Sequence, residues 1–167
     1  MTKTIIKAAL AATVATGLFA SPAMAADTET FTATARIVSP LELTLDNGGL
    51  DFGTITMGAA LVSSDVTVGR DGGLDACGLE LTCTAPTAAA FTVTGSINQD
   101  LDVSIVAPAT LDDGAGNSVA FAVDAPSLVT LDGAGTVSFE IGGTITVEAA
   151  TVDGTYSNTV DVTVEYS

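Results

Sequence analysis

The chain has 167 residues, with 20 acidic and four basic side chains, no histidine and no tryptophan. Two of the basic residues, Lys3 and Lys7, lie in a segment typical of an export signal, so the 142 residues after it carry a formal net charge of −18. So acidic a surface repels phosphate backbones and anionic lipids, which excludes nucleic-acid and membrane-surface binding. Without histidine, the sequence also excludes histidine-ligated zinc, a Ser-His-Asp triad and a Cys-His pair. We therefore expect no enzymatic activity and no cofactor.

Residues 1–25 have the pattern of a secretory signal peptide. Lys3 and Lys7 precede a short apolar stretch at 8–19, and a small-x-small site follows at Ala23 to Ala25. This arrangement predicts cleavage before Ala26. The apolar stretch is too short to span a bilayer as a helix, so we expect an exported protein without membrane insertion.

The composition after residue 25 favours β-structure, because Thr, Val, Ala and Gly dominate and apolar residues alternate with polar ones. Turn signals separate the alternating runs about every 8–12 residues, which indicates an all-β, immunoglobulin-like antiparallel sandwich. The predicted strands cover residues 31–37, 41–45, 50–55, 60–68, 79–84, 91–97, 101–106, 119–123, 128–131, 137–141, 144–147 and 160–166.

Cys77 and Cys83 are the only cysteines. In an exported protein, two cysteines this close predict a local disulfide. Two soft ligands are too few for a metal site, so we expect no bound metal.

Three clusters of polar residues are candidates for a ligand-binding or catalytic site. The turn at 112–117 offers oxygen ligands that suit calcium, but its Asp, Gly and Asn residues are also ordinary turn formers. The loop at 70–73 has too few donors to hold a phosphate. Asp100 and Asp102 share one strand face, as carboxylates on an exposed strand edge often do. None of the three predicts a catalytic or metal site.

The first alternating run has two interpretations. Phe31, Ala33, Ala35 and Ile37 alternate with polar residues, and Ser39-Pro40 then separates this run from the one at 41–45. Both runs would form one bent edge strand if the sandwich is complete. The other interpretation makes 31–37 a free arm that adds as a strand to a neighbouring molecule.

The last strand resembles that of subunits of bacterial chaperone–usher pili, and this favours the second interpretation. Val160, Val162 and Val164 alternate with polar residues, Tyr166 is the penultimate residue, and Gly154 is the fourteenth from the end. The segments at 50–53 and 79–83 are similar to the archaic pilus branch, whose subunits resemble spore coat protein U domains. The chain is also similar to small secreted proteobacterial proteins described only as a domain of unknown function.

The resemblance implies an incomplete sandwich, with an extension at 26–40 and a pilin-like domain at 41–167. A groove beside the strand at 160–166 would accept a neighbour's arm through Phe31, Ala33, Ala35 and Ile37. The implied function is that of a structural subunit of an extracellular filament that supports adhesion or biofilm formation. The implied partners are other copies of the chain, with a periplasmic chaperone and an outer-membrane usher during transit to the cell surface.

Two other functions stay open at the level of sequence. The chain would be a self-contained secreted coat or structural protein if its sandwich is complete. It would be a carbohydrate-binding adhesin module if a loop carries a sugar site, although the absence of tryptophan argues against the usual aromatic platform.

Overall fold

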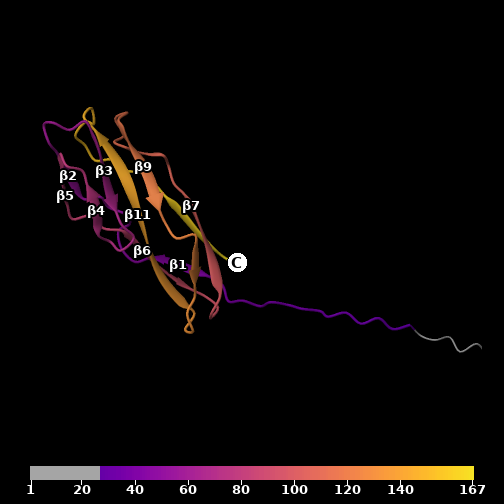
Figure 1. The fold of residues 1–167 in the computed structure, drawn as a ribbon. Helices are drawn as coiled ribbons and strands as arrows, with labels where there is room; N and C mark the ends of the chain where they lie inside the picture. The colour runs from indigo at the N-terminus through magenta and orange to yellow at the C-terminus, as the bar shows by residue number, and fades with distance from the viewer. Residues whose placement is uncertain (1–26) are drawn as a thin grey trace, which may run out of the picture. The chain divides into compact units, whose positions relative to one another are not determined.

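The computed structural model describes residues 27–167, and the predicted signal peptide lies outside the described residues. The chain divides into two compact units, Met1–Ala35 and Arg36–Ser167. In the first unit, residues 27–35 belong to no strand or helix. The second unit holds all the strands and is called the domain below (Figure 1).

The strands of the domain are all antiparallel, and most of them are short. Within residues 27–167 there is no helix long and apolar enough to cross a membrane. The strands are β1 Glu42–Leu45, β2 Thr54–Met57, β3 Ser63–Val68, β4 Leu74–Cys77, β5 Leu81–Thr84, β6 Ala89–Thr94, β7 Asp100–Val106, β8 Thr110–Asp112, β9 Ser118–Asp124, β10 Leu128–Thr130, β11 Thr136–Glu148 and β12 Asp161–Tyr166.

The long strand β11 is the centre of the larger sheet. Its first half pairs with β6, and its second half pairs with β3 on one side and β9 on the other. The sheet continues outward through β1, β4 and β8 to a total of seven strands. Because β11 changes partners along its length, the sheet curls around the core instead of staying flat.

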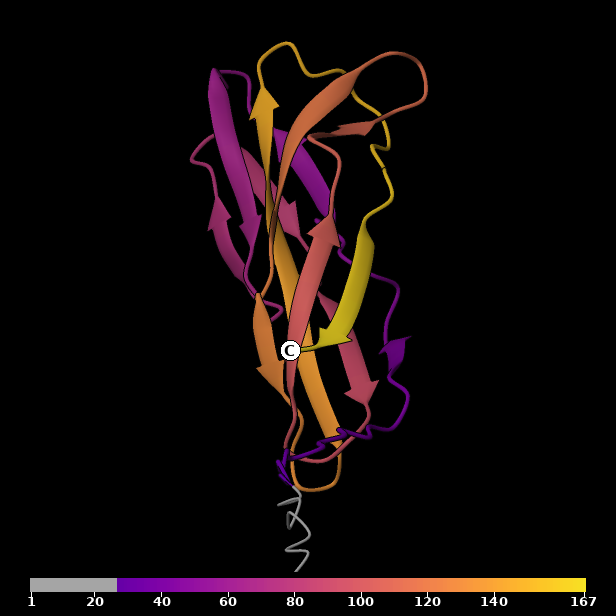
Figure 2. The same ribbon diagram turned by 90° about the vertical axis from the view of Figure 1, so that its right-hand side faces the viewer.

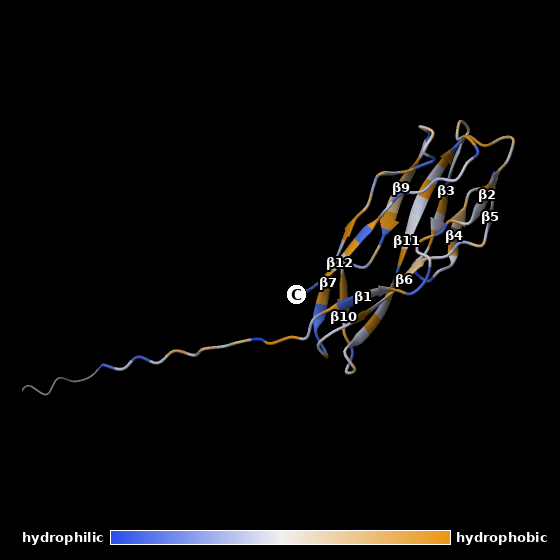
Figure 3. Ribbon diagram, turned by 180° about the vertical axis from the view of Figure 1, so that it is seen from behind, coloured by the Kyte–Doolittle hydropathy of each residue, from blue (hydrophilic) through white to orange (hydrophobic). Residues whose placement is uncertain are grey.

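A smaller three-stranded sheet, β10-β7-β12, forms the second layer, and β2 pairs with β5 beside the larger sheet (Figure 2). The core consists of two clusters of buried aliphatic and aromatic side chains. Val66, Val93 and Leu101 are fully buried within it. The hydropathy colouring follows the alternation along the strands (Figure 3). The all-β class and the antiparallel, incomplete sandwich predicted from the sequence are confirmed.

The predicted strands at 137–141 and 144–147 are wrong as separate elements, since β11 runs through both. Gly142 and Gly143 suggested a break, but they stand where β11 changes partners. A Cβ at Gly142 would collide with the Val68 carbonyl oxygen, and one at Gly143 would lie 2.9 Å from the Ala122 carbonyl oxygen. These glycines therefore permit the close approach of neighbouring strands.

Other boundaries also differ from the prediction. Residues 50–53 make only an isolated bridge, between Asp51 and Thr87, and β2 begins after Gly53. Strands β4 and β8 were not predicted, because each has only three or four residues next to a turn. Residues 31–37 are assigned to no strand, so they do not extend β1 into one bent edge strand.

Candidate functional site

Strand β12 has one free edge. It pairs only with β7, and the Ser167 N–H donates to the Asp100 carbonyl oxygen at 3.1 Å. Hydrogen-bonded positions alternate along an antiparallel pair, so the main-chain groups of Val162, Val164 and Tyr166 face away from β7. The side chains of the same three residues are half-buried against the core. This edge can therefore accept another strand.

Strand β1 has a free edge of the same kind. It pairs only with β6, and the Asp46 N–H donates to the Ala90 carbonyl oxygen at 2.8 Å. By the same alternation, Leu43 and Leu45 direct their main-chain groups away from β6. Strands β12 and β1, one in each layer, thus both have an edge with unused main-chain donors and acceptors.

An apolar groove of about 890 Å³ lies between these two regions of the chain. One wall comes from residues 45–57, from the end of β1 through β2. The other wall comes from residues 151–160 and Val162. The floor is made of core side chains, among them Phe121, Ile141 and Ile145. Phe52 on the wall packs edge-to-face on Phe121, with 6.1 Å between ring centroids. Core side chains of β6, β9 and β11 are thus accessible from one side.

Tyr166 closes the opposite end of the space between β12 and β1. Its hydroxyl donates to the Ser39 carbonyl oxygen at 2.7 Å and accepts from the Ser96 N–H at 2.8 Å. A Cβ on Gly95 would lie 2.5 Å from this hydroxyl and 2.7 Å from Leu41, which shows how tightly this end is packed. The groove is open at Val160 and Val162, which line it, and ends before Val164 and Tyr166, which do not. These are called its wide and narrow ends below.

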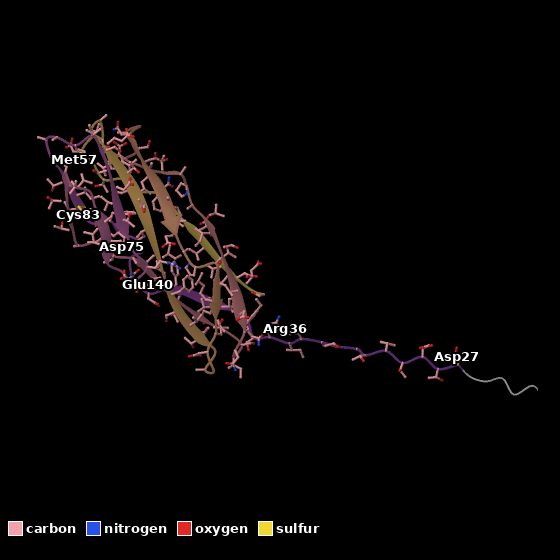
Figure 4. The ribbon with its side chains drawn as sticks, in the orientation of Figure 1. Asp27, Arg36, Met57, Asp75, Cys83 and Glu140 are labelled. Atoms are coloured by element: carbon pink, nitrogen blue, oxygen red, sulfur yellow. A yellow bond between two sulfur atoms is a disulfide. The ribbon has the colours of Figure 1, made fainter. Side chains whose placement is uncertain are left out.

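Arg36 lies on the narrow end, at the beginning of the domain (Figure 4). Its guanidinium stands 5.9 Å from the centre of the Tyr166 ring, in the range of a cation–π contact. It also donates to the Ser167 main-chain oxygen at 2.9 Å and to Gln99 Oε1. Arg36 therefore connects the residues before β1 with the end of β12. The sequence analysis did not single it out, although it is one of only two basic residues after residue 25.

The predicted disulfide is confirmed: Cys77 at the end of β4 is bonded to Cys83 in β5, with 6.1 Å between the Cα atoms. Strand β5 pairs with β2, whose Ile55 and Met57 line the groove. The disulfide thus attaches one wall of the groove to the edge of the larger sheet. Cys77 and Cys83 both pack against the core cluster that contains Phe52, Val66 and Phe121.

The proposed donor residues are exposed. Phe31 is 91% exposed and Ile37 is 93% exposed, and the side chains of Ala33 and Ala35 are also on the surface. Gly154 lies in the loop before β12, where it lines the groove. A Cβ there would be 3.7 Å from the nearest atom, an ordinary contact, so local packing does not require glycine at this position.

The turn at 112–117 is organised by Asp113. Its carboxylate accepts from the N–H groups of Ala115 and Asn117 and from the Asn117 side-chain amide, at 2.6–3.0 Å. The bond from the Asn117 side chain is the main cause that lowers the Asp113 pKa, followed by the bond from the Ala115 N–H. Within residues 27–167 no group of three or more His, Cys, Asp or Glu side chains is placed to hold a metal ion.

The other polar clusters are surface features. Arg70 pairs with Asp124 at 3.1 Å, and both side chains are exposed. Asp100 and Asp102 share one exposed face as predicted, but β7 is the central strand of its sheet, so their placement on a strand edge is wrong. Asp100 accepts a hydrogen bond from the Thr130 hydroxyl at 2.7 Å.

The groove, with the two free strand edges beside it, is thus the main candidate site of the domain. Comparison with curated proteins found no match, and neither did comparison with solved structures. A family model described as a domain of unknown function, DUF4402, matches residues 41–166, which is most of the chain, and the protein belongs to this family.

Proposed function

We propose that the protein is the structural subunit of an extracellular filament, in which the arm at 28–37 of one copy fills the groove of the next copy. The observation that carries the proposal is the apolar groove between the free edges of β12 and β1. A strand placed there would meet unused main-chain groups on both sides and apolar side chains underneath. Head-to-tail exchange of this kind does not close on itself, so it produces a filament.

The arm has the length and pattern that the groove requires. Phe31, Ala33, Ala35 and Ile37 span seven residues, about 23 Å of extended chain. The residues from Val160 to Tyr166 also span seven, with four apolar side chains on one face. Ile37 and Ala35 can therefore lie beside Val160 and Val162, which line the groove, while Ala33 and Phe31 extend toward the free edge at Val164 and Tyr166.

The apolar character of the groove supports a strand as its occupant rather than a sugar. Leucine, valine, isoleucine and phenylalanine side chains form much of its lining, while polar residues such as Asp153 and Asn158 lie in its walls. A saccharide on the apolar floor would leave hydroxyl groups without partners. Burial of Phe31 and Ile37 would contribute about 1.5–3 kcal/mol each, in addition to the main-chain hydrogen bonds.

An unfilled apolar groove is prone to aggregation, which supports the need for protection before assembly. In the proposed route the chain is exported, a periplasmic chaperone fills the groove in transit, and an outer-membrane usher exchanges the chaperone for the next subunit's arm. The filament at the cell surface would then support adhesion or biofilm formation.

Peptide capping tests the proposal. A chain without residues 28–35 keeps Arg36 and the whole domain, and a synthetic peptide of residues 28–37 should raise its Tm, because a ligand of the folded groove alone stabilises the folded state. The matched control is the same peptide with Phe31→Asp and Ile37→Asp, which should leave the Tm unchanged. Equal shifts with both peptides, or no shift with either, would contradict the proposal.

A further inference from the structure

The residues at the narrow end of the domain form a second surface, next to the point where the arm leaves the domain. Residues 36–39 and the β6–β7 turn enclose a hollow of about 410 Å³, called the base below. Val38 and Ile97 are exposed apolar side chains of the base, and Ile37 beside them is the last apolar residue of the arm. Such a patch is unusual on a chain whose formal charge is strongly negative.

We infer that the base is a contact surface for a second copy of the chain and seats on the acidic rim of that copy's groove. The rim is defined here as Asp51, Val152 and Asp153, which line the wide end of the groove. This inference rests on the proposed function, because it concerns the copy that receives the arm.

The shape of the groove sets the end at which the donor domain stands. Tyr166 and its hydrogen bonds to Ser39 and Ser96 close the narrow end of the receiving groove. The arm must therefore enter at the wide end, and Ile37, which is closest to the donor domain, comes to lie beside Val160 of the receiving copy. The donor strand then runs antiparallel to β12.

The connection between the two domains is very short. Ser39 is fixed to its own domain, because its N–H donates to Ser96 Oγ at 2.7 Å and its carbonyl oxygen accepts from Tyr166. Only Val38 separates Ser39 from Ile37, so at most about 7 Å of chain joins the donated strand to the donor domain. The base of the donor must then contact the rim of the receiving copy.

Charge and polarity are complementary across this contact. Arg36 precedes Ile37 in the arm and comes with it to the rim, which carries the carboxylates of Asp51 and Asp153. Val152 is 46% exposed and Ile97 is 56% exposed, so each surface offers an apolar side chain to the other. The local attraction opposes the general repulsion between two strongly acidic molecules.

The test compares substitutions at the base with matched substitutions elsewhere in the full mature chain. Ile97→Ser and Arg36→Ala alter the base, while Leu79→Ser and Arg70→Ala remove an even more exposed apolar side chain and the other arginine. All four variants should still form SDS-resistant ladders, because none alters the apolar lining of the groove. Subunits should leave Ile97→Ser filaments about fivefold faster than wild type, as expected for partial loss of one buried side chain.

Arg36→Ala filaments should also dissociate faster, and both base variants should give more strongly bent filaments in electron micrographs. If all variants form ladders and Ile97→Ser and Leu79→Ser filaments dissociate at equal rates, the contact between base and rim is overturned. The exchange of strands between copies is then still supported. No ladder in the wild type would overturn the proposed function and this inference together.

Discussion

The Tyr166 hydroxyl donates to the carbonyl oxygen of Ser39, 127 residues earlier in the chain, at 2.7 Å. This bond joins the end of β12 to the residues before β1, across the narrow end of the groove. A second bond, from the Ser96 N–H, fixes the same hydroxyl to the β6–β7 turn. One side chain thereby connects the two layers of the sandwich where no strand pairing does.

Tyr166→Phe should lower the free energy of unfolding by about 1–2 kcal/mol, because two hydrogen bonds are lost while the ring remains. The matched control is Tyr156→Phe, which removes one exposed hydroxyl that donates to the Val152 carbonyl oxygen at 2.7 Å. Urea denaturation checks the difference. Equal effects of the two substitutions would show that Tyr166 does not connect the layers.

The disulfide should stabilise the wall of the groove. Replacing both Cys77 and Cys83 by serine should cost about 2 kcal/mol of folding free energy, the chain-entropy value for so short a loop. It should also weaken binding of the arm peptide, since β5 supports β2. Denaturation and peptide titration measure the two effects, and mass spectrometry without reductant should show no free thiol in the wild type.

Two of the glycines on the groove walls, Gly53 and Gly154, should respond differently to substitution. Gly53 has φ +71°, and a Cβ there would collide with the Thr84 carbonyl oxygen, so Gly53→Ala should destabilise the fold by more than 1 kcal/mol, about the cost of an incompatible backbone. Gly154→Ala should leave the Tm nearly unchanged. A large loss of stability for Gly154→Ala, measured by thermal denaturation, would contradict the loop geometry described here.

Asp132 should make stability depend on acid pH. Its carboxylate accepts the Thr136 and Ala134 N–H groups, both at 2.9 Å, and these bonds lower its pKa below the ordinary value of 3.8. A lowered pKa adds stability that is complete above that value and disappears as the pH falls through the folded-state pKa. Asp132→Asn should therefore be less stable than wild type at pH 7, and the difference should shrink as the pH falls below 3.8. A difference that stays constant across this range in urea titrations would contradict the role of the charge.

Alternation predicted most of the fold because it records which face of a strand is buried. The strands around Val103, Phe121 and Val164 were found in this way, and so was the disulfide between Cys77 and Cys83. The continuity of β11 was missed, because Gly142 and Gly143 look like a break unless the neighbouring strands are known. Local pattern contains no information about close approach between distant strands.

The groove was predicted in part. The residues of β12 were identified from their alternation and their resemblance to pilin subunits, but the opposite wall at 45–57 was not. The segment with Asp51 and Phe52 was noted only for its resemblance to pilin subunits, and nothing in the sequence places it across from β12, since tertiary packing alone does so. Arg36 was missed for the same reason: its partners Gln99 and Ser167 are distant in the sequence.

The central claim, that one copy's arm fills another copy's groove, is tested most directly by mixing two defective chains. Phe31→Asp removes the arm's largest apolar side chain and leaves the groove intact. Leu45→Asp places a charge in the groove at a position that is 47% exposed, so the fold should be kept while the arm stays intact. Wild type should form filaments in electron micrographs, and each variant alone should stay monomeric. The account predicts that the mixture forms one-to-one dimers, measured by light scattering. It would be contradicted if the mixture stays monomeric and the wild type also forms no filaments.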